Sequence, residues 1–130
     1  MTVNQQTSTP AVYYNSIIIE IWKHINHKQY WTLMETKDAV KALSALAHET
    51  RLKAYRQLVQ AGSAGLQAGQ LADTLEMPPS SLSFHLKELM NADLLESKQE
   101  GRYVIYSIKF PSMSALLDFL TENCCAGDRC

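Results

Sequence analysis

The chain has 130 residues, of which 46% are hydrophobic and 19% are charged, and its formal net charge is −1. These values are typical of one soluble globular domain with a modest core. No apolar run reaches the roughly 18 residues that a membrane-spanning helix needs, and the N-terminus lacks the regions of a secretory signal. We therefore expect a cytoplasmic protein without membrane contacts. The near-neutral charge excludes nucleic-acid binding through bulk positive charge, so any DNA-binding cations must be placed locally.

All of the cysteines lie in the last eight residues, "NCCAGDRC", as Cys124, Cys125 and Cys130. An odd number of thiols cannot pair completely, and disulfides are uncommon in a reducing cytosol. A structural disulfide is therefore not expected. The cysteines of the tail formed by residues 124–130 are therefore candidates for binding or redox chemistry and not for stabilising the fold.

The first 33 residues are predicted to form an N-terminal extension, residues 1–33. Residues 1–11 are polar, and we expect them to be disordered. Residues 12–31 change to helical periodicity, with an apolar stripe of Ile18, Trp22 and Ile25. This pattern predicts an amphipathic helix that needs a partner surface.

Two helices are predicted next, separated by a short break at His48 and Glu49. The first begins near Met34, and three of its residues share one face: Val40, Leu43 and Ala47. The second has four residues that we expect to point inward: Leu52, Tyr55, Leu58 and Val59. It should end at Gly62 and Gly65, because glycine commonly terminates helices.

The rest of the sequence predicts two further helices, a β-hairpin and a last helix. "AGQLADTL" predicts a short helix with Leu71 and Leu75 inward, and a further helix begins at Pro79, a residue favoured at the first helical position. Its apolar face consists of Leu82, Leu86 and Leu89. "LLESKQ" and "RYVIYSIK" alternate as two strands around Glu100-Gly101, and a last helix begins near Pro111. The fold class is mainly α with a β-hairpin (α+β), arranged as a winged helix-turn-helix.

Three motifs in this order resemble the ArsR/SmtB family of transcriptional repressors. They are "ALAHETRLKAYRQL", "AGQLADTLEMPPSSLSFHLKEL" and "EGRYVIYSI", and the resemblance extends from about Thr36 to Leu120. It implies that residues 34–123 form a winged helix-turn-helix domain that binds double-stranded operator DNA as a homodimer. In this family the first and last helices dimerise, which correspond here to residues 36–47 and 112–123. The extra helix around Trp22 could lengthen that interface.

The helix that begins at Pro79 is the predicted recognition helix. Opposite its leucines lie Ser80, Phe84 and Lys87, with Ser81 and Ser83 on the flanks. Polar side chains near a helix N-terminus can read base edges or hold phosphate, although a solvated helix face would have the same composition. His85 borders the leucine face, where a half-buried histidine and a phosphate contact remain alternatives. Arg102 at the hairpin tip is placed to reach phosphate or a minor groove.

The sequence departs from the family pattern immediately before this helix. Pro78 stands where a serine or threonine commonly caps the recognition helix, and proline offers no side-chain oxygen.

The cysteine tail resembles one of several inducer sites known in the family. The C-x-C pattern of another site is missing from "GQLADTL", and the last helix offers Asp118 and Glu122 but no histidine for a zinc site. A vicinal pair with a third cysteine resembles the arsenic-responsive arrangement, which implies As(III) or Sb(III) bound by Cys124, Cys125 and Cys130. Soft thiolates suit such ions, and binding would release the repressor from its operator.

Three alternatives for the tail remain open at this point. They are a reversible disulfide between Cys125 and Cys130, Zn(II) or Cd(II) with Asp128 as a further ligand, and cysteines without a function. An enzyme is not expected, because the thiols follow a helix C-terminus, where the dipole raises a thiol pKa. The sequence also contains no phosphate-binding loop and no paired catalytic carboxylates.

Overall fold

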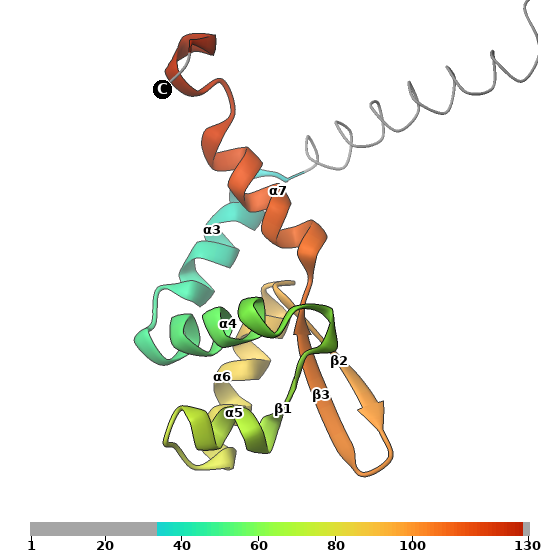
Figure 1. Ribbon diagram of the computed structural model, residues 1–130. Helices are drawn as coiled ribbons and strands as arrows, with labels where there is room; N and C mark the ends of the chain where they lie inside the picture. Colours follow the sequence, from blue (N-terminus) through green and yellow to red (C-terminus); the bar gives the residue numbers. More distant parts are fainter. Residues whose placement is uncertain (1–33, 129–130) are drawn as a thin grey trace, which may run out of the picture. The chain divides into compact units, whose positions relative to one another are not determined.

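Helices make up most of the fold, and a small antiparallel sheet lies at one side of them, in a computed structural model that describes residues 34–128 (Figure 1). The elements in chain order are α3 (Thr36–Leu46), α4 (Glu49–Ala61), the 3-10 turn η1 (Gly62–Ala64), β1 (Leu66–Gln67), α5 (Ala68–Thr74), α6 (Pro79–Asn91), β2 (Leu95–Glu100), β3 (Tyr103–Ile108), α7 (Phe110–Thr121) and the 3-10 turn η2 (Cys124–Gly127). This order confirms the predicted winged helix-turn-helix. The predictions for residues 1–33 and for Cys130 lie outside the described residues.

Leucines from α4, α5 and α6 form the centre of the core. The largest side chains with almost no exposed surface are Leu58, Leu71, Leu82, Leu86, Leu89, Leu94 and Ile108. Burying one leucine side chain stabilises the fold by about 1.5–3 kcal/mol. The predicted inward faces of α5 and α6 are therefore confirmed, with Leu75 packed against the edge of the core.

The inward faces of α3 and α4 differ from the simplest expectation, because alanines occupy them. Ala39, Ala42 and Ala45 of α3 are buried, and Ala54 of α4 has no exposed surface. The prediction that Leu52 and Val59 point inward was wrong, since their side chains are 45% and 37% exposed. Small side chains let helices approach closely, and a pattern search that weights large apolar residues overlooks such faces.

The β-hairpin is the wing of the fold. Residues Leu95 and Ile108 pair at its base, Glu100 and Tyr103 pair at its tip, and Gly101 and Arg102 form the connection between the strands. Gly101 has φ +60°, which glycine adopts easily. The predicted strands and turn are confirmed. The two-residue strand β1, which pairs with the other edge of β3, was not predicted because it is too short to show alternation.

A close backbone contact positions β1 against the wing. Gly65 has φ +67°, and a Cβ atom at this position would lie 2.3 Å from the carbonyl oxygen of Tyr106 on β3. Real Cβ atoms do not approach a backbone oxygen so closely, so only glycine fits here without movement of the sheet. Gly62 has the same φ of +67°, but a Cβ there would meet nothing within 4 Å.

No helix within residues 34–128 is both long and apolar enough to cross a membrane.

The two glycines form a matched test of the contact between β1 and β3. Gly62→Ala should cost about 1–3 kcal/mol, the usual cost of an unfavourable backbone conformation. Gly65→Ala should cost clearly more, because it adds a collision with Tyr106 to the same backbone cost. The free energy of unfolding in urea measures both. Equal losses for the two variants would contradict the steric role of Gly65.

Candidate DNA-binding interface and cysteine tail

The recognition helix α6 presents a polar face with one aromatic side chain at its centre. Ser80, Ser81, Ser83 and Lys87 are exposed, as predicted from the leucine spacing. Phe84 lies among them and is 62% exposed. The Ser83 hydroxyl donates a hydrogen bond of 2.9 Å to the carbonyl oxygen of Pro79. Its proton is therefore already used, although its oxygen can still accept.

The helix begins at Pro79 despite the unusual residue before it. Pro78 is the N-cap and provides no side-chain hydrogen bond. Its carbonyl oxygen accepts from the backbone N–H groups of Ser81 and Leu82, each at 3.1 Å. The fixed φ of proline at the first helical position thus starts the helix without a side-chain cap.

Arg102 is an exposed cation at the tip of the wing. Nearby on β2, Lys98 forms an ion pair of 3.2 Å with Glu100, which reduces its local charge. No carboxylate among residues 34–128 lies within ion-pair distance of Arg102. Its guanidinium is thus available for an external anion, as a phosphate contact requires.

His85 is the one predicted contact of α6 that faces protein. Its ring lies against the ring of His48, with 4.7 Å between centroids, and its Nδ1 atom is buried without a hydrogen-bond partner. Burial lowers the pKa of His85, and the nearby His48 and Arg51 lower it further. The neutral imidazole is therefore the favoured form beside α4.

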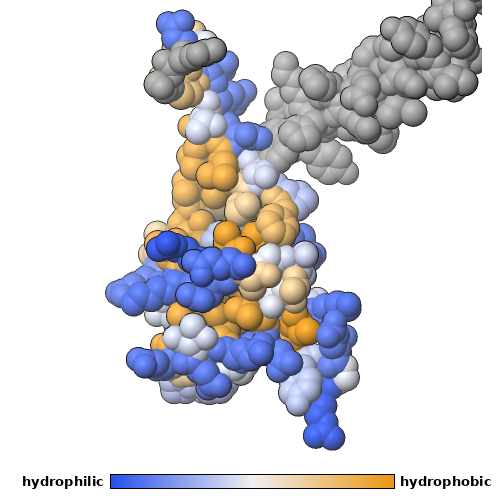
Figure 2. Space-filling view, in the orientation of Figure 1, coloured by the Kyte–Doolittle hydropathy of each residue, from blue (hydrophilic) through white to orange (hydrophobic). Residues whose placement is uncertain are grey.

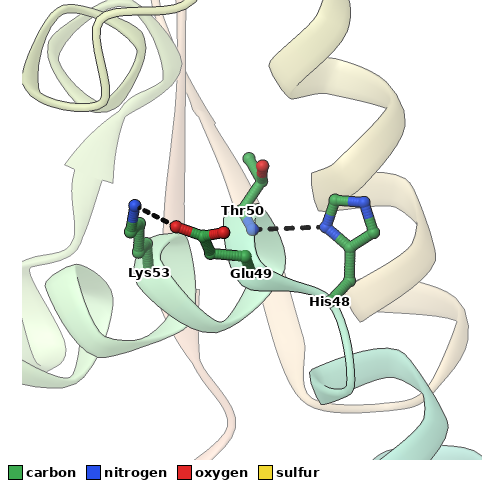
Figure 3. Close-up of polar contacts among 4 residues, drawn as sticks. All are labelled: His48, Glu49, Thr50 and Lys53. Atoms are coloured by element: carbon green, nitrogen blue, oxygen red, sulfur yellow. Dashed lines mark hydrogen bonds and ion pairs between the residues drawn. The ribbon is translucent and has the colours of Figure 1, made fainter.

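His48 connects this histidine pair to the start of α4, a role that the sequence reading missed. Its Nδ1 atom accepts a 3.2 Å hydrogen bond from the backbone N–H of Thr50 and so caps the helix (Figure 3). In the same turn Glu49 pairs with Lys53 at 2.6 Å. Histidine is an uncommon cap, so the short break seen in the sequence did not reveal this hydrogen bond.

The cysteines follow α7 in a turn with an unusual backbone. Asn123, Cys125 and Ala126 have φ values of 54°, 54° and 52°, which non-glycine residues rarely adopt. The turn brings the Sγ atoms of Cys124 and Cys125 to 3.5 Å from each other. Cys124 is a free thiol, whereas Cys125 is disulfide-bonded. Within residues 34–128 no three histidine, cysteine or acidic side chains form a metal-binding cluster, and the predicted third ligand lies outside this range.

The start of α7 is fixed to the end of α6 through Asp93. Its carboxylate accepts hydrogen bonds from the Lys109 ammonium and, at 3.1 Å, from the Ser112 hydroxyl. The Lys109 hydrogen bond holds the pKa of Asp93 below its ordinary value, and Ser112 adds to this effect. The backbone N–H of Lys109 also donates to Leu94 at 3.0 Å. The helix that precedes the cysteines is thus connected to the turn that follows the recognition helix.

Helices α3 and α7 expose an apolar surface. Its large side chains are Val40, Leu43, Leu117 and Leu120, each more than two-fifths exposed. The two helices contact each other, and a hydrophobic area along α7 is visible in Figure 2. Contiguous apolar surface on a small domain commonly marks an interaction site.

The winged helix-turn-helix fold and the polar exposed face of α6 are those of a DNA-binding regulator. Comparisons with known proteins point to the same class. Residues 46–98 match the family described as "Helix-turn-helix domain". The transcriptional activator HlyU of Vibrio cholerae is 30% identical over 91 residues, which cover 70% of this chain and 82% of HlyU. The arsenical resistance operon repressor of Bacillus subtilis is 32% identical over 81 residues, covering 62% of this chain and 73% of the repressor.

Solved structures show the same fold. The structure of HlyU from Vibrio cholerae has a TM-score of 0.54 and 33% identity, with 67% of this chain and 97% of that chain covered. A homodimeric winged helix-turn-helix domain from Mycobacterium bovis has a TM-score of 0.54 and 22% identity, with 67% and 81% covered. The chain belongs to the ArsR family of winged helix-turn-helix transcriptional regulators.

The lowered pKa of His85 makes the stability of the domain depend on pH. Because the folded state disfavours the imidazolium, the unfolded chain takes up this proton first as the pH falls below about 6.5. The stabilisation that comes from neutral His85 is therefore fully present at a pH above the pKa of this histidine in the unfolded chain. It is lost as the pH falls through the lower pKa of His85 in the folded protein. When the pH is lowered from about 7.5 to about 5.5, the free energy of unfolding should fall less for His85→Gln than for wild type, because glutamine does not take up a proton. Urea titrations at both pH values test this, and an unchanged difference would contradict it.

Proposed function

We propose that this protein is a transcriptional repressor that responds to As(III) or Sb(III). It binds its operator as a homodimer, and the metalloid binds Cys124, Cys125 and Cys130 and releases the DNA. The observation that carries the proposal is the convergence of two adjacent sulfur atoms directly after the last helix, 3.5 Å apart. A third cysteine follows five residues later in the sequence.

The separation of the two sulfur atoms suits a shared ion. Metal–sulfur bonds of about 2.3 Å in tetrahedral geometry separate two ligand sulfurs by about 3.8 Å. The pyramidal geometry of As(III) has narrower angles and needs a shorter separation. On an ordinary helix, neighbouring side chains diverge by about 100°. The left-handed backbone at Cys125 and Ala126 removes this divergence while Cys125 is disulfide-bonded. Reduction of that disulfide would then leave two neighbouring thiols for one ion.

The apolar surface of α3 and α7 supports a homodimer. Leu117 and Leu120 are 55% and 54% exposed, and α7 contacts α3, whose Val40 and Leu43 are also exposed. A two-fold dimer would bury this surface against its own copy and place two recognition helices on one inverted repeat. The homodimeric domain from Mycobacterium bovis has the same fold.

The connection from the tail to the DNA-binding face runs along α7. A metalloid at the end of this helix would change its position in the dimer, and the Asp93–Lys109 and Asp93–Ser112 hydrogen bonds would carry the movement to the end of α6. A coupling of about 2–3 kcal/mol would change operator occupancy tens to hundreds of fold. The chain needs no large refolding for such an effect.

The disulfide at Cys125 favours a second candidate, in which the same cysteines sense redox state. Oxidation would then replace metalloid binding as the signal that changes the end of α7. The two candidates share the operator and the dimer. They differ in the agent that releases DNA, namely arsenite acting on reduced thiols or a thiol oxidant acting alone.

The wing prediction concerns salt dependence. Arg102→Ala should weaken binding to all DNA sequences alike and should reduce the slope of log affinity against log salt by about one. Arg102→Lys keeps the charge and should keep the slope. Fluorescence anisotropy with labelled promoter DNA over a salt series measures both variants. A changed base preference with an unchanged slope in Arg102→Ala would show that the wing reads bases instead.

The tail prediction separates inducer binding from DNA binding. Cys124→Ser and Cys125→Ser should bind promoter DNA like wild type but should no longer be released by arsenite, because each lacks one of three sulfur bonds. A phosphine reductant keeps the thiols reduced during the titration without competing for arsenite. Cys130→Ser should weaken the response, with complete loss expected only for the adjacent pair.

Two controls decide between the alternatives. Asp128→Asn should leave the arsenite response intact, whereas it should weaken a Zn(II) or Cd(II) site that uses this carboxylate. Release of wild type by the oxidant diamide, without any effect of arsenite on reduced protein, would support the redox candidate. A Cys124→Ser, Cys125→Ser double variant that arsenite still releases would exclude the metalloid site in the tail, and one that diamide still releases would exclude the redox candidate.

A further inference from the structure

We propose that Phe84 is the main base-reading side chain of α6 and that it contacts the C5-methyl group of thymine in each operator half-site. This inference rests on the DNA-binding part of the proposed function and adds the identity of a base. It is independent of the inducer.

The exposure of Phe84 is the first observation. Its side chain is 62% exposed, the largest value among the large hydrophobic residues of the described chain. It lies on the face opposite the buried leucines, where the neighbouring exposed residues Ser80, Ser81, Ser83 and Lys87 are polar. A phenyl ring exposed to water at the centre of a DNA-binding face gains by meeting an apolar group. In the major groove the thymine methyl is the apolar group.

The second observation is that this face of α6 lacks most of the side chains that commonly read bases. Residues 79–87 include no arginine, asparagine or glutamine. Arginine, which reads guanine, and asparagine and glutamine, which read adenine, are therefore not available in this stretch, and Lys87 in the third turn is its one cationic side chain that can reach the O6 and N7 atoms of guanine. The serine hydroxyls accept or donate to many base edges and discriminate weakly, and the proton of Ser83 is already bonded to Pro79. A lysine also binds phosphate whatever the base, so Phe84 is the side chain of the first two turns whose contact depends most on which base it meets.

The third observation is that the protein holds the ring in place. Phe84 contacts the His85 ring edge to face, with 6.0 Å between centroids and an interplanar angle of 73°. His85 in turn lies on His48, which caps α4. An aromatic pair of this geometry is favourable beyond its buried area. A ring positioned before binding loses less conformational freedom when it meets a base.

The test begins without a known operator. Wild-type protein selects its preferred sequences from a pool of random DNA duplexes, and each thymine of the selected half-site is then replaced by deoxyuridine, which lacks only the methyl group. We expect one position per half-site at which the replacement weakens wild-type binding about fourfold, the effect of one buried methyl group. Phe84→Ala should bind the thymine and deoxyuridine duplexes equally well.

Phe110→Ala is the matched control, because it removes an exposed phenyl ring from α7, away from the face of α6. It should keep the wild-type sensitivity to deoxyuridine. Equal urea midpoints for wild type and Phe84→Ala show that the variant is folded. If wild type selects a sequence but no deoxyuridine position separates it from Phe84→Ala, this inference is overturned and the proposed function stands. If wild type selects no sequence, the proposed function fails and the inference fails with it.

Discussion

The burial of one row of leucines on α6 determines what this protein can present to DNA. Leu82, Leu86 and Leu89 are at most 1% exposed and lie at the centre of the core. One residue of helix is a rotation of about 100°, so any change in the rotation of α6 would bring serines into the core and leucines into water. Such a change would cost several times the 1.5–3 kcal/mol roughly gained for each buried leucine. The orientation of the recognition face follows from the core alone, before any DNA is present.

The rest of the domain attaches to this helix at both ends. At its N-terminal half, His85 packs on His48 and thereby on the start of α4. Beyond its C-terminus, Asp93 bonds to Lys109 and Ser112 and thereby to α7. The two attachments differ in kind, because the first is a ring contact that favours neutral histidine and the second is a network of charged hydrogen bonds. Under the proposed function, a signal at the end of α7 would reach α6 at the end that does not carry the proposed base-reading residues.

The sequence predicted those parts of the fold that large apolar residues define. The leucine spacing of α6 and the alternation of β3 predicted the recognition helix and the wing, because large apolar residues recurred at the period of a helix and of a strand. The faces of α3 and α4 were harder, since Ala39, Ala42 and Ala54 bury completely while Leu52 remains exposed. The cap at His48 and the turn at Cys125 depend on hydrogen bonds and backbone angles that no spacing rule encodes. The exposed serines of α6 were predicted correctly, yet the structure was needed to separate His85 from them.

The distribution of charge supports the proposal that an apolar side chain reads a base in the operator. Four lysines of the described chain are paired with carboxylates: Lys37, Lys53, Lys98 and Lys109. In the DNA-binding elements, Lys87 and Arg102 have no ion-pair partner among residues 34–128. With few available cations, the sequence-independent attraction to phosphate is weak, since that attraction grows with the number of neutralised phosphates. A larger share of the binding free energy must then come from base contacts that depend on the spacing of two recognition helices. Under the proposed function, a small change in that spacing would release the regulator from its operator, and a coupling of a few kcal/mol from the end of α7 would be enough.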